Sequence, residues 1–502
     1  MFNPVHKLIQ VVNFIKDSRD FSKFITRAIV NIDPPETKKK TICVSVHPWH
    51  GQAVPWFAIA LSLSLYKTSK DNVIILLDDI NIGSDNLFFT IQINYIEKIL
   101  KKISPFIKYT KLSSYQFNNH SPDYAFIELI ASLNSIHHTK GEIDHFTRNK
   151  YEEAIKPQLN TAFSALIEYF NVVDVDKCVI AGGIWGSSGI FRHISIENNL
   201  KIMTYDSGGG RMLFSTSGVA AQLNDITLVF SEIFSDIKSK KFAISQGYDQ
   251  LKRREGGGDV VSFFNPNTIA NINSGNQYYL ILLNLVWDSA ALGIHSVYNS
   301  SIEWILDTIR WVLENTNKTI VIRQHPVERE KHIKVSDNYK CKIIEVFGCN
   351  NRVIFVEAKS DISTYELIKK AGCIVGFSST AAVESVALGK PAIIVSSAYY
   401  ASLGIVYSAK NKKQYYDYLM KADNNKLIVT KDMRERAYIC NYLSQTCNWI
   451  DTQFTPFRSD FSDWSKMDLE SLNNDNPIAE LIELEIPTSI KKHQSLMKSI
   501  DE

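Results

Sequence analysis

The chain has 502 residues, of which 45% are hydrophobic and 22% are charged, and its formal net charge is +2. These values predict a folded protein of more than one domain, and they exclude the strongly basic composition of a polyanion-binding protein, so we expect no nucleic-acid partner. Seven scattered cysteines without a C-x-x-C pair predict reduced core thiols rather than a disulfide framework.

Residues 1–37 predict an N-terminal helical segment. Apolar residues at helical spacing between 5 and 15 form one stripe, and basic residues surround it. The stripe suits packing on a domain, and a helix lying on a membrane surface is the alternative. We recognise no secretory signal, and the longest uncharged run, 51–66, is shorter than the roughly 20 apolar residues that a membrane-spanning helix needs. We therefore expect a cytoplasmic protein, with peripheral contact at the inner face of the cytoplasmic membrane as a second expectation.

Residues 38–250 predict a first Rossmann-like domain. Apolar strand patterns alternate with helical patterns, which is the order of a doubly wound parallel sheet. Ligands of such sheets bind at the carboxyl ends of the strands. The loop after the first strand carries His47, His50 and Gln52, which are therefore candidate ligand contacts; a structural loop with a capping histidine is the alternative. The predicted strands are 41–46, 72–77, 177–181 and 201–205.

Two glycine-rich turns follow the last two of these strands, at 182–189 and 206–211. Glycine allows a close approach of backbone to a ligand, so both turns indicate a binding cleft. Neither contains the G-x-G-x-x-G fingerprint of dinucleotide-binding proteins. The candidate acceptor contacts in these turns are Gly186, Ser187, Gly208 and Arg211.

One acidic pair, Asp174 and Asp176, has the D-x-D form of a metal-binding motif. It precedes a predicted strand, at the end opposite to strand-end ligands. We therefore predict no metal ion and no cofactor, with charge on a substrate neutralised by a helix N-terminus and by basic side chains.

A second Rossmann-like domain is predicted at 278–407, after a polar, glycine- and asparagine-rich linker at 251–277. Residues 408–502 predict a charged, helical C-terminal extension. The predicted strands of the second domain are 278–286, 319–323, 352–356, 373–376 and 392–395.

Polar residues follow three strands of this second domain, and together they match the needs of a bound nucleotide. N–H donors and a cation would hold the phosphates, and an acidic group would accept from ribose hydroxyls. Three of the candidates have a structural alternative: His325 caps a helix, Glu384 lies on a solvated helix face, and Asp288 is an N-cap. The candidates are Asp288, Arg323, His325, Pro326, Ser378, Ser379, Thr380 and Glu384.

A strand ending Arg323-Gln324-His325-Pro326, followed by one ending Ser378-Ser379-Thr380 with Glu384 and Gly389-Lys390-Pro391 downstream, resembles the GT-B glycosyltransferases of bacterial surface polysaccharides. Capsule polysaccharide and Kdo transferases are similar over about 278–400, and bacterial sialyltransferases are more distant. The resemblance implies that the His-Pro and Ser-Ser-Thr elements bind the donor nucleotide and that Glu384 contacts its ribose or base.

The resemblance also implies an acceptor-binding first domain with an acidic catalytic base. The matching residue is Asp206, although this chain has Asp-Ser where sialyltransferases have two acids before glycine. His50 and Asp288 are the next candidates.

From these features we expect transfer of a sugar from a nucleotide donor, such as CMP-Kdo or a related CMP-sugar, to a lipid-linked or oligosaccharide acceptor of a capsule, O-antigen or other surface glycan. Contact with other polysaccharide-assembly proteins is a further expectation. The alternatives are transfer of a polyol phosphate from a CDP-alcohol, sugar-nucleotide epimerisation, and a non-catalytic glycan-binding partner.

Overall fold

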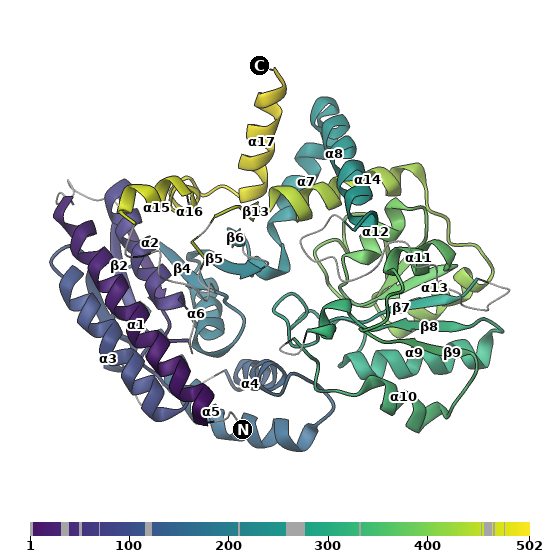
Figure 1. The fold of residues 1–502 in the computed structure, drawn as a ribbon, viewed down its shortest axis with the longest axis horizontal. Coiled ribbons are helices and arrows are strands. Elements are labelled where there is room, and N and C mark those ends of the chain that lie inside the picture. The colour runs from purple at the N-terminus through teal and green to yellow at the C-terminus, as the bar shows by residue number, and fades with distance from the viewer. Residues whose placement is uncertain are drawn as a thin grey trace. The chain divides into compact units, whose positions relative to one another are not determined.

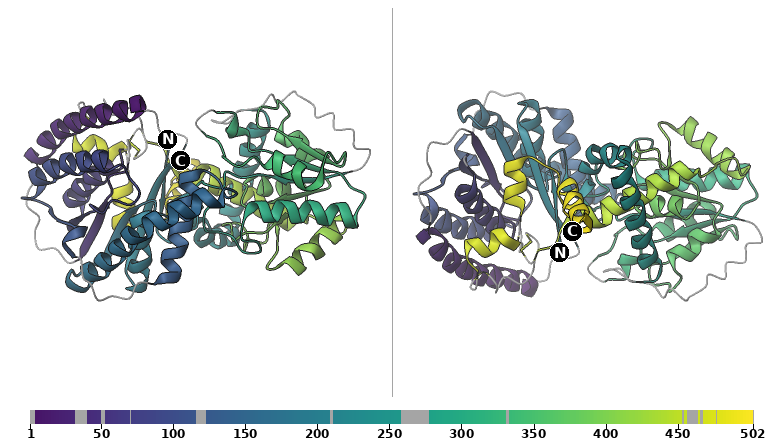
Figure 2. Two further views of the ribbon diagram at one scale, coloured as in Figure 1. Left: turned by 90° about the horizontal axis from the view of Figure 1, so that it is seen from below. Right: turned by 90° about the horizontal axis from the view of Figure 1, so that it is seen from above.

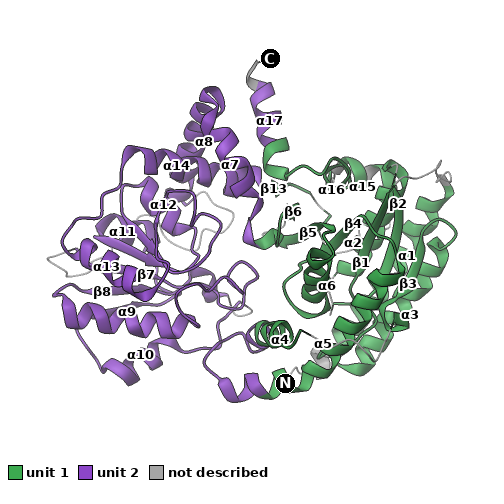
Figure 3. Cartoon of the chain, turned by 180° about the vertical axis from the view of Figure 1, so that it is seen from behind, with its two compact units in different colours: residues 1–134, 150–221, 449–491 green, residues 135–149, 222–448, 492–502 purple. Residues whose placement is uncertain are grey.

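The chain folds into two compact units (Figures 1 and 3). The first consists of residues 1–134, 150–221 and 449–491, and the second of residues 135–149, 222–448 and 492–502. The computed structural model describes residues 4–31, 40–49, 53–69, 71–115, 123–208, 211–257, 277–330, 333–452, 454–455, 464, 467–475 and 477–501.

The first unit is built on a mainly parallel sheet. Its strands are β1 (Thr41–Val46), β2 (Asn72–Leu77), β3 (Lys108–Lys111), β4 (Lys177–Ala181), β5 (Lys201–Gly208), β6 (Arg211–Ser215) and β13 (Trp449–Ile450). They lie in the order β13-β6-β5-β4-β1-β2-β3, with β6 and β13 antiparallel to their neighbours. The five parallel strands have the order 3-2-1-4-5, which is that of a doubly wound sheet. The predicted fold class is confirmed for this unit.

The helices of this unit cover the sheet and one another. They are α1 (Pro4–Ala28), α2 (Val54–Thr68), α3 (Asn86–Ile103), α4 (Tyr124–Thr139), α5 (His145–Val172), α6 (Gly186–Glu197), α15 (Leu469–Asp475) and α16 (Ile478–Leu484); α4 and α5 each cross the boundary between the units. α2 packs on β1 and β2 and is itself covered by α15 and α16. Every residue from Val54 to Tyr66 is therefore buried, as expected for a helix that is apolar on all sides.

Helix α1 lies alongside α3 (Figure 2) and also contacts α2. The side chains that pack there are Phe14, Phe21 and Phe24, all buried. The stripe predicted between residues 5 and 15 does not supply this contact, because Leu8 and Val12 are more than half exposed. The buried residues Phe14, Phe21 and Phe24, rather than the apolar residues of the stripe, attach the helix.

The second unit contains a six-stranded parallel sheet. Its strands are β7 (Tyr279–Leu282), β8 (Ile320–Arg323), β9 (Val353–Val356), β10 (Cys373–Gly376), β11 (Ala392–Ile394) and β12 (Tyr407–Ser408), in the order β12-β11-β10-β7-β8-β9. Read from β9, this is the order 3-2-1-4-5-6 of a Rossmann fold. The predicted second Rossmann-like sheet is confirmed.

The helices of the second unit extend beyond both ends of the predicted range, 278–407. They are α7 (Asp225–Ser235), α8 (Ile237–Glu255), α9 (Ser301–Asn315), α10 (Tyr339–Phe347), α11 (Thr364–Lys370), α12 (Ala381–Ala387), α13 (Lys412–Asp423) and α14 (Lys431–Tyr442), and α17 (Thr488–Asp501) begins in the first unit and ends in the second. α8 packs closely on α14, because a Cβ at Gly247 would lie 1.9 Å from the carbonyl oxygen of Tyr438. Because of this contact, α7 and α8 belong to the second unit, although they precede the predicted linker in the chain.

The linker predicted at 251–277 lies mostly outside the described residues, and α8 continues past its predicted start to Glu255. The C-terminal extension divides between the units: residues up to 448 belong to the second, and residues 449–491 return to the first.

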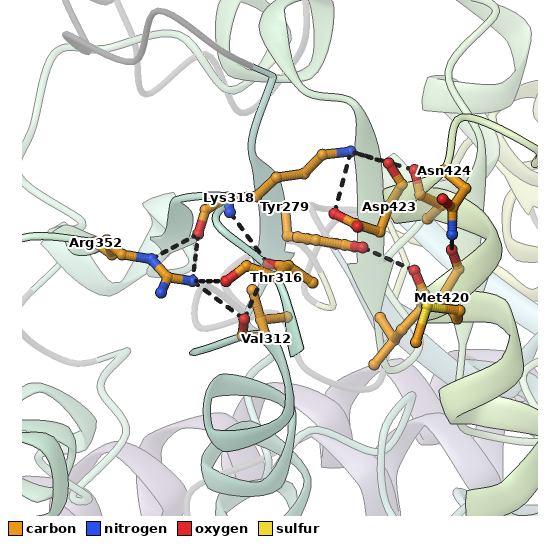
Figure 4. A network of polar contacts seen from close by, with 10 residues as sticks. Tyr279, Val312, Thr316, Lys318, Arg352, Met420, Asp423 and Asn424 are labelled. Carbon is orange, nitrogen blue, oxygen red and sulfur yellow. Dashed lines mark hydrogen bonds and ion pairs between the residues drawn. The ribbon is translucent and has the colours of Figure 1, made fainter. Parts of the chain in front are cut away.

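A polar network fixes the amino ends of the second sheet (Figure 4). The Arg352 guanidinium donates to the carbonyl oxygens of Val312 and Thr316, at 3.1 and 2.6 Å, where α9 ends. Lys318 Nζ donates to the carbonyl oxygen of Asp423 at 3.0 Å, at the end of α13. Cations at helix C-termini satisfy carbonyls that lack an intrahelical partner, so this edge of the sheet is occupied by structural contacts.

Candidate functional site

The three loops predicted to bind a nucleotide are neighbours in the second unit. They follow β7, β8 and β10, and the sheet order places these strands side by side as β10-β7-β8. The chain leaves β7 and β10 toward opposite sides, which is the switch point where ligands of doubly wound sheets bind. The predicted placement of these loops at one sheet edge is confirmed.

The loops after β7 and β10 are joined by Asn284 and Ser378. Asn284 Nδ2 donates to Ser378 Oγ at 3.1 Å, and Ser378 N donates to Asn284 Oδ1 at 3.3 Å. Ser379 Oγ accepts from Ala381 N, and the Ser379 carbonyl accepts from the Tyr400 hydroxyl at 2.8 Å. Thr380 is the N-cap of α12 but makes no side-chain capping bond.

Arg323 is a buried cation at the end of β8, with 1% of its surface exposed. Its guanidinium donates to the carbonyl oxygen of Glu357 at 2.5 Å and to Thr364 Oγ1 at 3.5 Å. The remaining nitrogen, NH2, is buried without a hydrogen-bond partner among the described residues. Burial, together with the charge of Arg329, lowers the pKa of Arg323 to about 10, so it remains charged at neutral pH.

His325 caps the short 3₁₀ turn Pro326–Arg329, as the structural alternative anticipates. Its Nδ1 accepts from Val327 N at 3.3 Å, which requires the neutral ring to carry its proton on Nε2. Burial, and then the charge of Arg323, lower the pKa of His325 to about 4. The ring is therefore neutral at pH 7 and offers one N–H donor that no described residue accepts.

Glu384 is buried and engaged within the unit. Its Oε2 accepts from the Tyr365 hydroxyl at 3.0 Å, and its Oε1 lies 2.6 Å from the Arg254 guanidinium of α8. Its exposed fraction is 2%, so it does not lie on a solvated helix face. Both oxygens thus have partners in the chain, and the ribose or base contact implied by the resemblance stays a prediction.

Asp288 lies in the turn after β7. Its Oδ1 accepts from Ala290 N at 3.1 Å, the local bond expected of a capping aspartate. Burial raises its pKa, and the nearby His137 opposes that rise. His137 Nδ1 lies 3.1 Å from the carbonyl oxygen of Trp287, so α4 reaches this turn.

The switch point of the first unit, between β1 and β4, holds a closed polar network. His47 Nδ1 lies 3.0 Å from Asp78 Oδ2, and His47 Nε2 lies 3.0 Å from Ser45 Oγ. Ser187 Oγ donates to the same Asp78 oxygen. His47 is 2% exposed, and both its ring nitrogens are occupied. His47, Asp78 and Ser187 therefore join three loops, and contact of His47 or Ser187 with an acceptor stays a prediction.

Two residues of the first-unit prediction, His50 and Gln52, lie outside the described residues. The preceding Trp49 stacks on His47 with ring centroids 5.4 Å apart. Gly186 begins α6 with a φ of +57°, a left-handed conformation that favours glycine.

Asp206 lies inside a strand rather than after one. β5 continues to Gly208 and turns back into β6, with Asp206 paired to Leu213. The predicted end of this strand at Tyr205 is therefore wrong, because an antiparallel hairpin extends it beyond the last residue that pairs with β4. Asp206 Oδ1 accepts from Ser207 N at 2.7 Å, as expected of an aspartate that caps the turn.

The other two acceptor candidates flank the same hairpin. Gly208 and Arg211 pair with each other, and the Arg211 guanidinium lies 4.4 Å above the Trp449 ring. A Cβ at Gly208 would meet that ring at 3.3 Å. The hairpin is thus packed on a tryptophan from the C-terminal part of the chain.

Acidic groups that could hold a metal ion lie elsewhere. Asp176 accepts from Thr41 N at 2.7 Å, at the amino end of the first sheet, so the D-x-D pair has the position predicted for it. Asp123, His193 and Glu197 bring three ligand atoms within 4.8 Å of one another on the surface of the first unit. Their spacing also fits an ordinary i,i+4 ion pair, since His193 Nε2 lies 3.3 Å from Glu197 Oε1.

Sequence reasoning missed Asn284 and Asp78 as members of the two switch points. A signal for Asn284 exists, because it is the single polar residue in the apolar run from Tyr279 to Val286. Asp78 directly follows a strand, as strand-end ligands do, but its partner Ser187 lies too far along the chain for a sequence pattern to reveal the pairing.

Part of the chain is similar to capsule proteins. Residues 250–437 match the family model described as "Capsule polysaccharide biosynthesis protein". These residues include β7 to β12 and all three loops of the second switch point. The resemblance predicted from the strand-end motifs is confirmed over this segment.

A curated relative is the capsule polysaccharide export protein KpsS of Escherichia coli, 26% identical over 133 residues, which are 26% of this chain and 33% of that protein. The match thus spans about a third of that relative's length.

Two solved structures illustrate the wider likeness. The beta Kdo 2,4 transferase KpsC of Thermosulfurimonas dismutans is 14% identical with a TM-score of 0.35, over 53% of this chain and 79% of that one. A UDP-N-acetylglucosamine 2-epimerase from Listeria monocytogenes, described as putative, is 10% identical with a TM-score of 0.26. The match covers 80% of this chain and 91% of that one. Likeness at this level does not bear on activity.

Among the described residues, no helix is both long enough and apolar enough to cross a membrane.

Proposed function

We propose that the chain is a glycosyltransferase of capsule or related surface-polysaccharide synthesis, which transfers a sugar from a nucleotide donor to a glycan acceptor. The family match carries the proposal, because the matched segment is the one that forms the second switch point. A strand-end switch point with N–H donors and a cation suits a nucleotide phosphate.

The donor would bind at the loops after β7, β8 and β10. His325 presents a neutral Nε2–H, and Arg323 retains one nitrogen without a hydrogen bond. Both side chains are held in place by bonds within the unit, and a preorganised dipole and positive charge are the condition for effective electrostatic stabilisation of a leaving phosphate. The Asn284–Ser378 bonds hold the third loop beside them.

The first unit would bind the acceptor, and Asp206 would accept a proton from its attacking hydroxyl. General-base catalysis needs a carboxylate oxygen within roughly 2.6–3.2 Å of that hydroxyl. Asp206 lies beyond the parallel part of its sheet, at the carboxyl edge, where acceptor contact is expected.

Release of free nucleotide tests this proposal. The full chain is incubated with CMP-, CDP-, UDP- and GDP-activated donors and a capsular oligosaccharide, and both nucleotide and elongated glycan are measured by mass spectrometry. We expect one donor class to support acceptor-dependent release, and the same rate in excess chelator because no metal is predicted. Epimerised donor without glycan elongation, or no turnover of any donor, would contradict the proposal.

A further inference from the structure

The first unit contains a cavity of about 360 Å³ whose lining includes none of the switch-point residues described above. It lies beside the first residues of β5, between α6 and the segment after β6. β6 pairs with β5 only from Thr204 onward, so Lys201, Ile202 and Met203 have no strand on that side. The volume falls in the range of small-molecule pockets, roughly 300–1,000 Å³. The lining residues are Arg192, Ile196, Leu200, Lys201, Ile202, Met203, Thr216, Ser217, Gly218 and Glu485.

Arg192 is the unusual group in this cavity. Its Nε is buried without a hydrogen-bond partner, and no ion pair to its guanidinium exists among the described residues. Its stem packs against the backbone of Gly183, which has a φ of +84°. A side chain at Gly183 would not fit there, because its Cβ would lie 3.1 Å from Arg192 Cδ. Burial lowers the pKa of Arg192, yet arginine remains charged at neutral pH. Arg192 is half-buried, its Nε has no partner, and no carboxylate of the described residues pairs with it, so the cavity offers an anion an unbalanced cation.

The other charges near the cavity do not supply that anion. Glu485 is paired with Lys201 and with Lys177, the latter at 2.7 Å. Lys177 also lies 3.7 Å from Asp71. The carboxylates of Glu485 and Asp71 thus balance the charges of Lys177 and Lys201, and the charge of Arg192 is not balanced by either carboxylate.

The wall opposite α6 is fixed in place. Ser215 Oγ accepts from Ser217 N at 3.2 Å and from Gly218 N at 3.1 Å. Thr204 Oγ1 donates to the Gly218 carbonyl at 2.7 Å and accepts from Ala220 N at 2.9 Å. A segment tied at both ends gives a preformed cavity, which lowers the ordering cost of binding.

We propose that this cavity is a binding site for a small anionic sugar, whose carboxylate or phosphate pairs with Arg192. The oxyanion would form charge-assisted hydrogen bonds with the guanidinium, as arginine does with planar anions. Ile196, Leu200 and Met203 would cover the apolar face of the sugar ring. The site is separate from the proposed donor site, which belongs to the other unit.

The test is calorimetric titration of the full chain with glucuronate, glucose 6-phosphate and neutral glucose. We expect saturable binding of at least one anion and none of glucose. Arg192→Met should weaken anion binding about tenfold to a hundredfold, as loss of a charged hydrogen-bond pair does. Arg192→Lys should retain part of the affinity, and Arg310→Met, at an exposed arginine of α9, should change nothing. The tighter-binding anion distinguishes a sugar acid from a sugar phosphate.

A thermal scan without ligand provides a second readout. Because Arg192 has no anionic partner among the described residues of the ligand-free protein, removing its charge should cost no stability, and Arg192→Met should melt at or above the temperature of the wild-type protein. Binding of glucose as tight as that of either anion, binding of neither anion at millimolar concentration, or equal affinity in Arg192→Met would each overturn the assignment. A clearly lower melting temperature for Arg192→Met would also overturn it, by showing that the guanidinium stabilises the empty protein.

Discussion

Asn284 and Ser378 exchange two hydrogen bonds across the switch point of the second sheet. Asn284 Nδ2 donates to the Ser378 hydroxyl, and the Ser378 backbone N–H donates to the side-chain oxygen Oδ1 of Asn284. The two residues follow adjacent strands that are far apart in the chain, β7 and β10. Asn284 therefore acts as a positioning residue for the loop that is predicted to bind phosphate.

Replacing Asn284 should impair nucleotide binding through that loop. Asn284→Ala removes both bonds, and Asn284→Asp removes the amide donor and adds a negative charge near a predicted phosphate. We expect about tenfold weaker nucleotide binding for each, measured by calorimetry. Asn315→Ala, at the exposed end of α9, is the matched control and should bind normally. Unchanged affinity in both Asn284 variants would show that the loop keeps its position without this bridge.

Protonation of His325 should make the protein less stable in acid. The pKa of the ring is about 4 in the folded chain against an ordinary 6.5. Between these values the unfolded chain binds more protons, so the free energy of unfolding falls as the pH drops from 6.5 toward 4. His325→Gln should flatten this part of the profile, as measured by urea unfolding at several pH values.

The exposed His145 supplies the control for this experiment, and His145→Gln should leave the slope as it is in the wild-type protein. An equal slope in wild type and His325→Gln would mean that the ring is not held neutral.

The Glu384–Arg254 ion pair should contribute to stability independently of any ligand. Glu384→Ala removes the carboxylate of a buried ion pair, and removing one member of such a pair costs about 3 kcal/mol of unfolding free energy. The double variant Glu384→Gln, Arg254→Met should recover part of the loss, because it removes both charges of the pair. Chemical denaturation measures both values.

Glu345→Ala, which breaks an exposed pair with Lys342, should cost less than about 1 kcal/mol. If Glu384→Ala unfolds as the wild type does yet loses nucleotide affinity, Glu384 is a ligand contact rather than an anchor.

Asp206→Asn separates a catalytic base from a structural cap. The amide oxygen can still accept from Ser207 N, so the hairpin should remain intact, while the base is lost. We expect turnover to fall on the order of a hundredfold or more, with donor affinity unchanged. Near-normal turnover would assign Asp206 to the turn alone and direct attention to His50 and Asp288.

The sequence predicted the two sheets well because each buried parallel strand is a continuous apolar run. The runs at Thr41–Val46 and Cys373–Gly376 match the observed strands at both ends. β3 and β13 were missed, since Lys108–Lys111 is polar at an edge and Trp449–Ile450 is too short to produce a pattern. The strand predicted at 201–205 matches the start of β5, but the glycine-rich turn predicted at 206–211 covers the end of β5 and the start of β6, because glycines of a hairpin resemble those of a ligand-binding turn.

The sequence predicted which loops form the site, but not which side chains bond to one another within it. Strand ends located His325 and Ser378, since parallel strands share one carboxyl edge. Arg323 bonds to Glu357, His47 to Asp78 and Glu384 to Arg254 across 34, 31 and 130 positions of the chain, and no local pattern encodes these pairings.

The return of residues 449–491 to the first unit affects how this protein can be synthesised. β13 pairs with β6 only after the entire second sheet has left the ribosome. At about 5–20 residues per second, the nascent first unit waits on the order of tens of seconds with the edge of β6 uncovered and with α2 lacking α15 and α16. An unpaired strand edge and an uncovered apolar helix are each targets for aggregation, so holdase chaperones should bind nascent chains during this interval and release them once the C-terminal elements have docked.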